Sequence, residues 1–223
     1  MLFSETNVRE NLRTRDGKRV FYLGRGDQLT SSARDWLRRE RIEILPADQA
    51  KPSRYKLLSG GYLEEKPEHM THLGGDILVE KTHPRIIFRG KLDSLESQFL
   101  WTIHRLPQLK KPLEEILSLA REIMACDVLE KPLKWDTLCG LTEAEQRRRS
   151  HIPQEYYGQP HFMPSAEDGE TILRLNRLRT AVRETELSAA AAYPGTTRTD
   201  LLRALNRMSS MVYLLMIEQK GKL

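Results

Sequence analysis

Polar and charged side chains recur at helical spacing in three parts of this sequence, and they are its best candidates for chemistry. Their members are Arg85, Arg89, Asp93 and Glu96, then Asn176, Arg179, Arg183 and Glu186, then Asn206, Ser209, Ser210 and Tyr213. Spacing alone leaves two interpretations open. The stripes are either solvent-exposed helix faces, held by ion pairs worth ~0.2–0.5 kcal/mol each, or the walls of a cleft in which guanidinium groups bind a polyphosphate.

A glycine pair precedes the first stripe, in the segment Thr71-His72-Leu73-Gly74-Gly75-Asp76, and Lys81 follows it. Glycines let backbone N–H groups approach phosphate oxygens, and a lysine adds a point charge. A simple turn explains the pair equally well, because the segment is neither a P-loop nor a dinucleotide fingerprint. The chain has no Gly-x-Ser-x-Gly elbow, no His-Glu-x-x-His pair and no Cys-x-x-Cys. We therefore expect neither a nucleophilic triad nor a zinc-bound water.

Composition excludes several classes of protein. The chain has 223 residues, 39% of them hydrophobic, which is enough for a core and excludes wholesale disorder. No apolar run approaches a membrane span, and the N-terminus does not resemble a secretory signal. Two cysteines, Cys126 and Cys139, are too few for a disulfide framework and indicate a cytoplasmic protein. The net charge of +5 is dispersed and aromatic residues make up 7%, so we expect no nucleic-acid binding.

The first sixty residues differ from the rest. Residues 18–23 and 42–45 are β-prone, and Thr30 can cap a short helix over 33–37 between them. This order predicts a small β-α-β-like piece. Residues 46–67 contain prolines and paired glycines and are expected to form a linker or mobile loop. The predicted division is residues 1–60, a small β/α segment, and 61–223, a helical domain.

The second part is predicted to be a helix bundle. Pro84 suits the first position of a long helix, whose apolar residues would be Phe88, Leu92, Leu95, Phe99, Ile103 and Leu106. Further helices are expected over 113–127, 170–192 and 197–219, and Thr142 with Glu145 forms a capping box for a shorter one. A loop over 154–169 separates the last two long helices from the others. The expected fold is mainly α, an up-down five-helix bundle with the N-terminal β-α-β-like extension.

Three ordered motifs resemble those of corrinoid adenosyltransferases. They are the first-helix signature at residues 81–94, an arginine-rich helix at 175–186 and a final-helix motif at 205–210. Segments 29–34, 66–73 and 161–164 are most similar to the ethanolamine-utilisation branch, which is related to the propanediol-utilisation branch. The resemblance covers residues 66–217 well and the first sixty residues loosely.

The resemblance implies an enzyme, a transferase. In such an enzyme the 5′-deoxyadenosyl group of ATP passes to the Co(I) of cobalamin, a corrinoid, and triphosphate leaves. Co(I) is itself a strong nucleophile, so no protein base is needed. The protein has to align the ribose C5′ with cobalt and stabilise a charged leaving group, with Mg²⁺ accompanying ATP. The family assembles as homotrimers with both substrates bound between subunits.

The family's roles transfer position by position. Asp93, Arg179 and Arg183 match catalytic positions, with Asp93 pairing an arginine, expected to be Arg183. Glu186 and Asn206 match positions near the triphosphate, the ribose and Mg²⁺. Arg85 matches a motif arginine that either binds ATP or is structural. The family's phosphate loop corresponds approximately to Thr71, His72, Gly75, Asp76 and Lys81.

The chain departs from its branch in one respect and leaves one position open. Members of the branch often carry a cysteine-rich metal motif, but residues 51–65 contain no cysteine, so we expect no metal held by cysteine. In the segment His161-Phe162-Met163, expected to bind the corrinoid, either His161 or Phe162 faces the corrin. An apolar lower face would make Co(II) easier to reduce, and Phe162 is favoured.

The resemblance also implies partners and a location. A reductase, expected to be flavin-based, would supply the electron, and ethanolamine ammonia-lyase would use the product. The protein would be cytoplasmic and associated with a bacterial microcompartment. The alternative is a noncatalytic corrinoid or nucleotide carrier, or a bundle associated with a microcompartment. Joint retention of Asp93, Arg179, Arg183 and Asn206 argues against that alternative.

Overall fold

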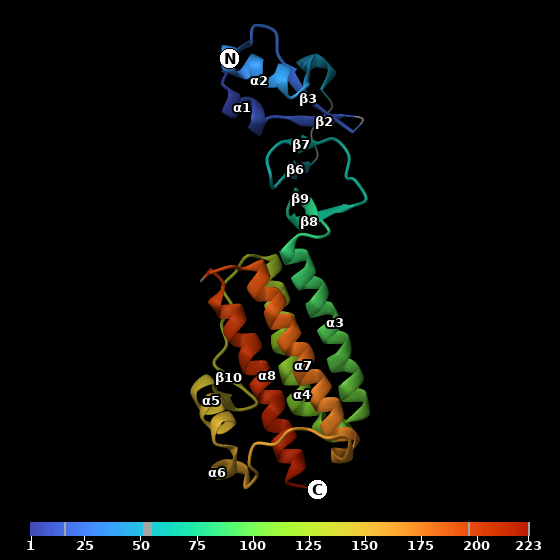
Figure 1. The fold of residues 1–223 in the computed structure, drawn as a ribbon, viewed down its shortest axis with the longest axis vertical. Coiled ribbons are helices and arrows are strands. Elements are labelled where there is room, and N and C mark those ends of the chain that lie inside the picture. The colour runs from blue at the N-terminus through green and yellow to red at the C-terminus, as the bar shows by residue number, and fades with distance from the viewer. Residues whose placement is uncertain (16, 51–54, 196, 223) are drawn as a thin grey trace. The chain divides into compact units, whose positions relative to one another are not determined.

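The computed structural model describes residues 1–15, 17–50, 55–195 and 197–222 and divides into two compact units (Figure 1). The first unit is Met1–His83 and the second is Pro84–Leu223. The boundary therefore lies beyond residue 60, where the sequence analysis divides the chain, because strands between residues 62 and 80 belong to the sheet of the first unit.

The first unit is built on a seven-stranded sheet with strand order β5-β3-β2-β7-β6-β9-β8. Its strands are β2 (Arg13–Arg15), β3 (Lys18–Leu23), β5 (Glu43–Pro46), β6 (Tyr55–Leu57), β7 (Tyr62–Leu63), β8 (Met70–Gly74) and β9 (Ile77–Glu80). A separate parallel pair joins β1 (Leu2–Phe3) to β4 (Gln28–Leu29). Two helices, α1 (Glu5–Glu10) and α2 (Ser31–Arg39), complete the unit with the short 3-10 turn η1 (Ala47–Gln49).

The predicted β-α-β piece is confirmed. Strands β3 and β5 pair in parallel, and α2 is the connection between them. The side chain of Thr30 caps α2 by accepting a hydrogen bond from the backbone N–H of Ala33, as N-cap residues do. Phe21 from β3 and Trp36 and Leu37 from α2 are buried in one cluster, which holds the helix on the sheet.

The prediction that residues 46–67 form a linker or mobile loop is wrong for the described part of that segment, since 51–54 lie outside the described residues. Strands β6 and β7 pair with each other and extend the sheet through β9 and β2. Gly61, at φ +89°, is one of the glycines that suggested a loop. A Cβ there would lie 2.9 Å from the carbonyl oxygen of Leu12, so this glycine allows close packing between strands.

The second unit is the predicted helical bundle. Four long helices, α3 (Pro84–Arg105), α4 (Lys110–Val128), α7 (Gly169–Ala192) and α8 (Thr199–Lys220), run alongside one another (Figure 1). The shorter α5 (Glu143–His151) packs on α8 as a fifth helix, followed by α6 (Pro153–Tyr157). Minor elements are the hairpin of β10 (Thr137–Leu138) and β11 (Leu141–Thr142) and the 3-10 turns η2 (Pro107–Leu109) and η3 (Ala166–Asp168).

The core of the bundle follows the apolar spacing of the sequence. Phe88, Leu92, Leu95 and Phe99 are buried along one side of α3, as predicted. Pro84 begins that helix, and both hydrogen bonds of the Thr142–Glu145 capping box are present at α5. Among the described helices, none is both long and apolar enough to cross a membrane.

Candidate active site

A pocket of about 550 Å³ lies between α7 and α8, and the second and third polar stripes line it. Arg179, Arg183 and Glu186 come from α7, and Asn206 comes from α8. The remaining lining residues are Ser150, Leu187, Ala190, Leu202, Ser209, Ser210 and Tyr213. Of the two interpretations left open by spacing, the structure therefore supports a cleft for these two stripes.

The pocket carries two arginine charges that form no ion pair with a described carboxylate. Arg179 donates to the side-chain oxygen of Asn176 at 3.1 and 3.3 Å, and neither Arg179 nor Arg183 forms an ion pair with a described carboxylate. Burial and the neighbouring Arg183 charge lower the pKa of Arg179 below its usual range, yet a guanidinium stays protonated at neutral pH. Two adjacent cations in a half-buried pocket favour an anion with several oxygen atoms.

Glu186 is the group in this pocket best suited to a hard cation. Its Oε1 accepts a hydrogen bond of 3.1 Å from Asn206 Nδ2, which leaves Oε2 without a partner among the described residues. The other side-chain atom of Asn206, Oδ1, accepts from Arg207 and is less available as a ligand. Mg²⁺ is commonly held by one or two carboxylates together with substrate phosphates, and Glu186 fits that pattern. No cluster of three metal-binding side chains occurs in the described chain.

The segment expected to bind the corrinoid lies against α8. His161 Nδ1 is 2.9 Å from the Tyr213 hydroxyl, and its Nε2 is 3.1 Å from the backbone oxygen of His151. The Phe162 ring lies 6.5 Å from the Tyr213 ring, with Lys220 Nζ 5.8 Å from Phe162. Met163 is 89% exposed. Because both ring nitrogens of His161 are already bonded, this arrangement favours Phe162 as the group that faces an apolar ligand.

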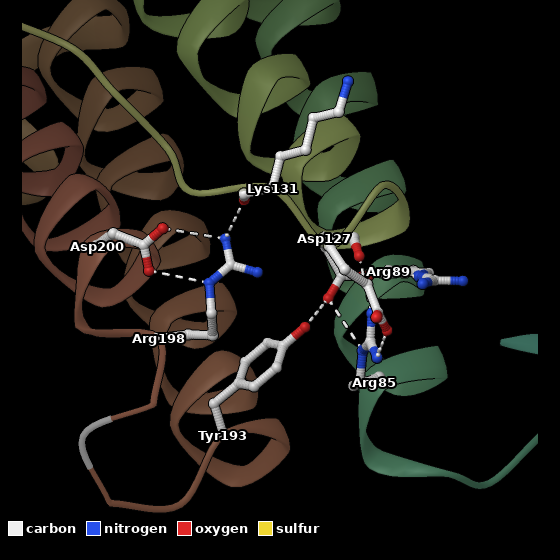
Figure 2. Close-up of polar contacts among 8 residues, drawn as sticks. Arg85, Arg89, Asp127, Lys131, Tyr193, Arg198 and Asp200 are labelled. Atoms are coloured by element: carbon white, nitrogen blue, oxygen red, sulfur yellow. Dashed lines mark hydrogen bonds and ion pairs between the residues drawn. The ribbon is translucent and has the colours of Figure 1, made fainter. Parts of the chain in front are cut away.

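Arg85 lies outside this pocket, in a polar cluster around Asp127 (Figure 2). The Asp127 side chain, which is 0% exposed, accepts hydrogen bonds from Arg85 Nε at 3.3 Å and Arg89 Nε at 2.5 Å. The hydroxyl of Tyr193 also donates to Asp127, and Arg85 donates to Glu130 at 2.7 Å. These contacts join α3, α4 and the end of α7, so they favour the structural alternative for Arg85.

The same cluster continues to the start of α8. Arg198 donates to both carboxylate oxygens of Asp200, at 2.9 and 3.0 Å, and to the backbone oxygen of Lys131 at 3.0 Å. Asp200 in turn accepts the backbone N–H of Leu133 at 2.8 Å. Burial raises the pKa of Asp200, but hydrogen bonds from Arg198 and Leu133 outweigh that effect, so the pKa is lowered overall. Hydrogen bonds between charged groups thus join the helices at this end of the bundle.

Asp93 is exposed on α3 and does not line the α7–α8 pocket. No ion pair joins it to Arg183 within the described part of the chain. The expected pairing of these two residues is therefore not made inside one subunit.

The candidate phosphate loop belongs to the first unit. Thr71 and His72 lie on β8, and Gly75 and Asp76 form the turn to β9. His72 Nδ1 lies 3.0 Å from the carbonyl oxygen of Gly75, whose φ of +52° suits glycine. Lys81 forms an exposed ion pair of 3.0 Å with Glu68. The loop is thus a β-hairpin, and it is not among the residues that line the α7–α8 pocket.

Sequence reasoning missed two residues. Ser150, near the end of α5, lines the pocket. It was missed because it follows a run of arginines, which is typical of a solvated helix surface. Asp127 was missed although a signal existed: it lies four residues after Ile123, on the buried side of α4. A carboxylate at a core position requires buried cationic partners.

Comparison with known proteins agrees with these observations. A sequence model of the family described as cobalamin adenosyltransferase matches residues 61–218. The chain is 34% identical to the corrinoid adenosyltransferase EutT of Salmonella typhimurium, over 98% of this chain and 92% of that protein. It is 39% identical to the EutT of Escherichia coli K12, over 69% of this chain and 59% of that protein. No solved structure matches significantly. Helices α7 and α8, which line the arginine pocket, both carry motifs of this family. This agreement and the extent of the similarity show that the chain belongs to the cobalamin adenosyltransferase family.

Proposed function

We propose that this protein is an ATP:cob(I)alamin adenosyltransferase that serves ethanolamine utilisation. It transfers the 5′-deoxyadenosyl group of ATP to the Co(I) of the corrinoid and releases triphosphate. The observation that carries the proposal is the pair Arg179 and Arg183 in the α7–α8 pocket, two cations that form no ion pair with a described carboxylate. A triphosphate is an anion of the size and charge that such a pair binds.

The reaction requires no general acid or base from the protein. The electron pair of Co(I) forms the cobalt–carbon bond, the C5′–O bond breaks, and its electron pair leaves with the triphosphate. Arg179 and Arg183 stabilise that leaving group, whose charge becomes more exposed as the bond breaks. Asn206 Nδ2, anchored by Glu186 at 3.1 Å, has a second hydrogen that it can donate to the ribose. Such positioning reduces the entropy cost of aligning two large substrates.

Finer features of the proposal rest on the family and on single observations. Mg²⁺ would bind the phosphates with Glu186, whose Oε2 has no partner among the described residues. The hairpin carrying Thr71, His72, Gly75, Asp76 and Lys81 would supply further phosphate contacts. A reductase would deliver the electron, and ethanolamine ammonia-lyase would receive the product. The location would be the cytoplasm, in association with a bacterial microcompartment.

An anaerobic assay tests the activity directly. The purified protein is mixed with chemically reduced Co(I) cobalamin and Mg-ATP, and the visible spectrum and triphosphate are followed. We expect a light-sensitive Co–C product and one triphosphate for each adenosyl group. Binding of ATP or cobalamin without product would favour the noncatalytic carrier instead. Binding of neither would refute both.

Two arginine variants place the activity in the pocket. Arg183→Ala should lower kcat/KM by roughly 100-fold or more, as loss of a group that stabilises charge in the transition state does. Arg121→Ala is the matched control, because Arg121 is an exposed arginine of α4 that pairs with Glu96 at 2.8 Å outside the pocket. Equal activity of the two variants would remove Arg183 from the mechanism.

We also propose a homotrimer in which Asp93 of one subunit pairs with Arg183 of the next. Asp93→Asn and Arg183→Ala proteins should each be nearly inactive. Coexpressed in equal amounts, they should recover activity, because about a quarter of sites in a head-to-tail ring would combine two intact residues. Absence of recovery in mixed trimers of confirmed mass would contradict a shared site.

A further inference from the structure

Tyr213 is the side chain that connects the arginine pocket to the segment expected to bind the corrinoid. Its ring lines the pocket from α8, and the Arg179 guanidinium lies 6.0 Å from the ring centroid. The His161 ring stacks on Tyr213 at 5.8 Å with an interplanar angle of 12°, and Phe162 stacks at 6.5 Å. One aromatic residue therefore contacts both parts of the site.

The direction of each hydrogen bond around Tyr213 follows from the chemistry of the partners. The backbone oxygen of His151 can only accept, so His161 Nε2 at 3.1 Å carries the hydrogen. In a neutral imidazole the lone pair is then on Nδ1, which accepts from the Tyr213 hydroxyl at 2.9 Å. The Tyr213 hydroxyl thus holds His161 by a hydrogen bond, and the Tyr213 ring packs against Phe162.

We propose that Tyr213 is a positioning residue that fixes the His161-Phe162 segment beside the nucleotide pocket and keeps His161 Nδ1 from becoming a ligand of the corrinoid cobalt. The segment then presents the Phe162 ring, an apolar group, to the corrinoid. This inference rests on the proposed function for its consequence in catalysis. The hydrogen-bonding arrangement itself is independent of that function.

The variant Tyr213→Phe separates the hydroxyl from the ring. It keeps the stacking on His161 and the contact with Arg179, and it removes the hydrogen bond to His161 Nδ1. In ¹⁵N NMR spectra of the full-length protein, the Nδ1 signal of His161 should move toward that of an imidazole nitrogen that accepts no hydrogen bond, while Nε2 keeps its hydrogen against the His151 carbonyl. With Co(I) cobalamin and Mg-ATP, kcat/KM for the corrinoid should fall roughly 10-fold, the effect of losing an ordinary hydrogen bond. The KM for ATP should change by less than about 2-fold, because the arginine side of the ring is intact.

The matched control is Tyr156→Phe. The Tyr156 ring contacts Arg148 and Arg149, and its hydroxyl has no hydrogen bond to another described residue. This control should leave the His161 signals and both kinetic parameters unchanged. In a His161→Ala background, Tyr213→Phe should cost less than it does alone, because its partner is already absent.

The outcomes separate this inference from the proposed function. An unchanged His161 Nδ1 signal in Tyr213→Phe overturns the inference, whether or not the protein is active. Equal loss of kcat/KM for ATP and for the corrinoid overturns it as well, because that pattern indicates general damage to the site. A wild-type protein that makes no product refutes the proposed function, while the NMR comparison still tests the hydrogen bonds.

Discussion

Replacing Asp127 with asparagine should destabilise the full-length protein by about 3–5 kcal/mol, the range for breaking a buried ion pair. The substitution keeps the shape of the side chain and removes its charge. Arg85 and Arg89 are only 13% and 14% exposed, so water cannot replace the lost carboxylate around them. In addition, the asparagine NH₂ would face groups that are themselves donors, two guanidiniums and the Tyr193 hydroxyl.

The magnitude follows from the contacts. Each guanidinium charge lies at about 4 Å from the carboxylate, which corresponds to roughly 4 kcal/mol at an effective dielectric constant near 20. Arg85 retains Glu130 at 2.7 Å, so its loss is partly compensated. Arg89 pairs with no second carboxylate among the described residues, and its Nη2 is already buried without a partner there. The larger share of the cost therefore arises at Arg89.

Thermal unfolding followed by far-UV circular dichroism measures the effect. A loss of this size lowers Tm by roughly 6–20 °C for a domain of this length. The control is Glu96→Gln, which breaks the pair with Arg121 at 2.5 Å, where the side chains are 35% and 54% exposed. Such an exposed pair is worth about 1 kcal/mol or less. If Asp127→Asn costs no more than Glu96→Gln, the reasoning about buried charge at this cluster is wrong.

Three further substitutions test separate parts of the structure. Burial and the hydrogen bond to Asp127 raise the pKa of Tyr193 from 10 to about 12, so the folded protein binds this proton more tightly than the unfolded chain does. The contribution of this proton to the free energy of unfolding is complete below pH 10 and is lost as pH rises through 12. Urea titrations should therefore show a steeper loss of unfolding free energy from pH 10 to pH 12 in the wild type than in Tyr193→Phe. Parallel pH profiles of the two proteins would contradict this. Thr142→Ala removes the capping box of α5 and should cost about 1 kcal/mol in urea unfolding, whereas no change would mean that the cap is dispensable. Glu186→Gln should raise the Mg²⁺ concentration for half-maximal activity by roughly 10-fold, and an unchanged Mg²⁺ dependence would exclude Glu186 as a ligand.

The helices of the second unit could be predicted because their signals are local. Pro84 begins α3, and Phe88, Leu92 and Leu95 repeat every three or four residues along its buried side. Each signal involves residues within one or two helical turns, so a single sequence contains it.

The sheet of the first unit could be predicted only in part. Strands β6 and β7 have three and two residues, too few for a visible alternation. Their parallel partners β9 and β2 are distant in the sequence, and such pairing leaves no local pattern. Prolines and paired glycines therefore dominated the interpretation of residues 46–67, although Gly61 serves close packing against Leu12.

The candidate site shows the same division between local and distant information. The stripes of α7 and α8 were visible from spacing, and only their meeting in one pocket required the structure. The counterion of Arg85 could not be predicted, because Asp127 is 42 residues away. Nor does spacing reveal that Tyr213 bonds His161, which lies 52 residues earlier.

Electrostatics distinguishes arginines that the sequence alone presents as equivalent. Arg85 and Arg89 share the buried carboxylate of Asp127, and removing it leaves two cations with little access to water. Arg179 and Arg183 instead lie together without an ion-pair partner among the described carboxylates, and burial and the Arg183 charge lower the pKa of Arg179. Repulsion between two neighbouring cations does not stabilise a fold, and local destabilisation of this kind is typical of functional sites. The first pair therefore belongs to the scaffold, and the second is where a polyphosphate would restore electrostatic balance.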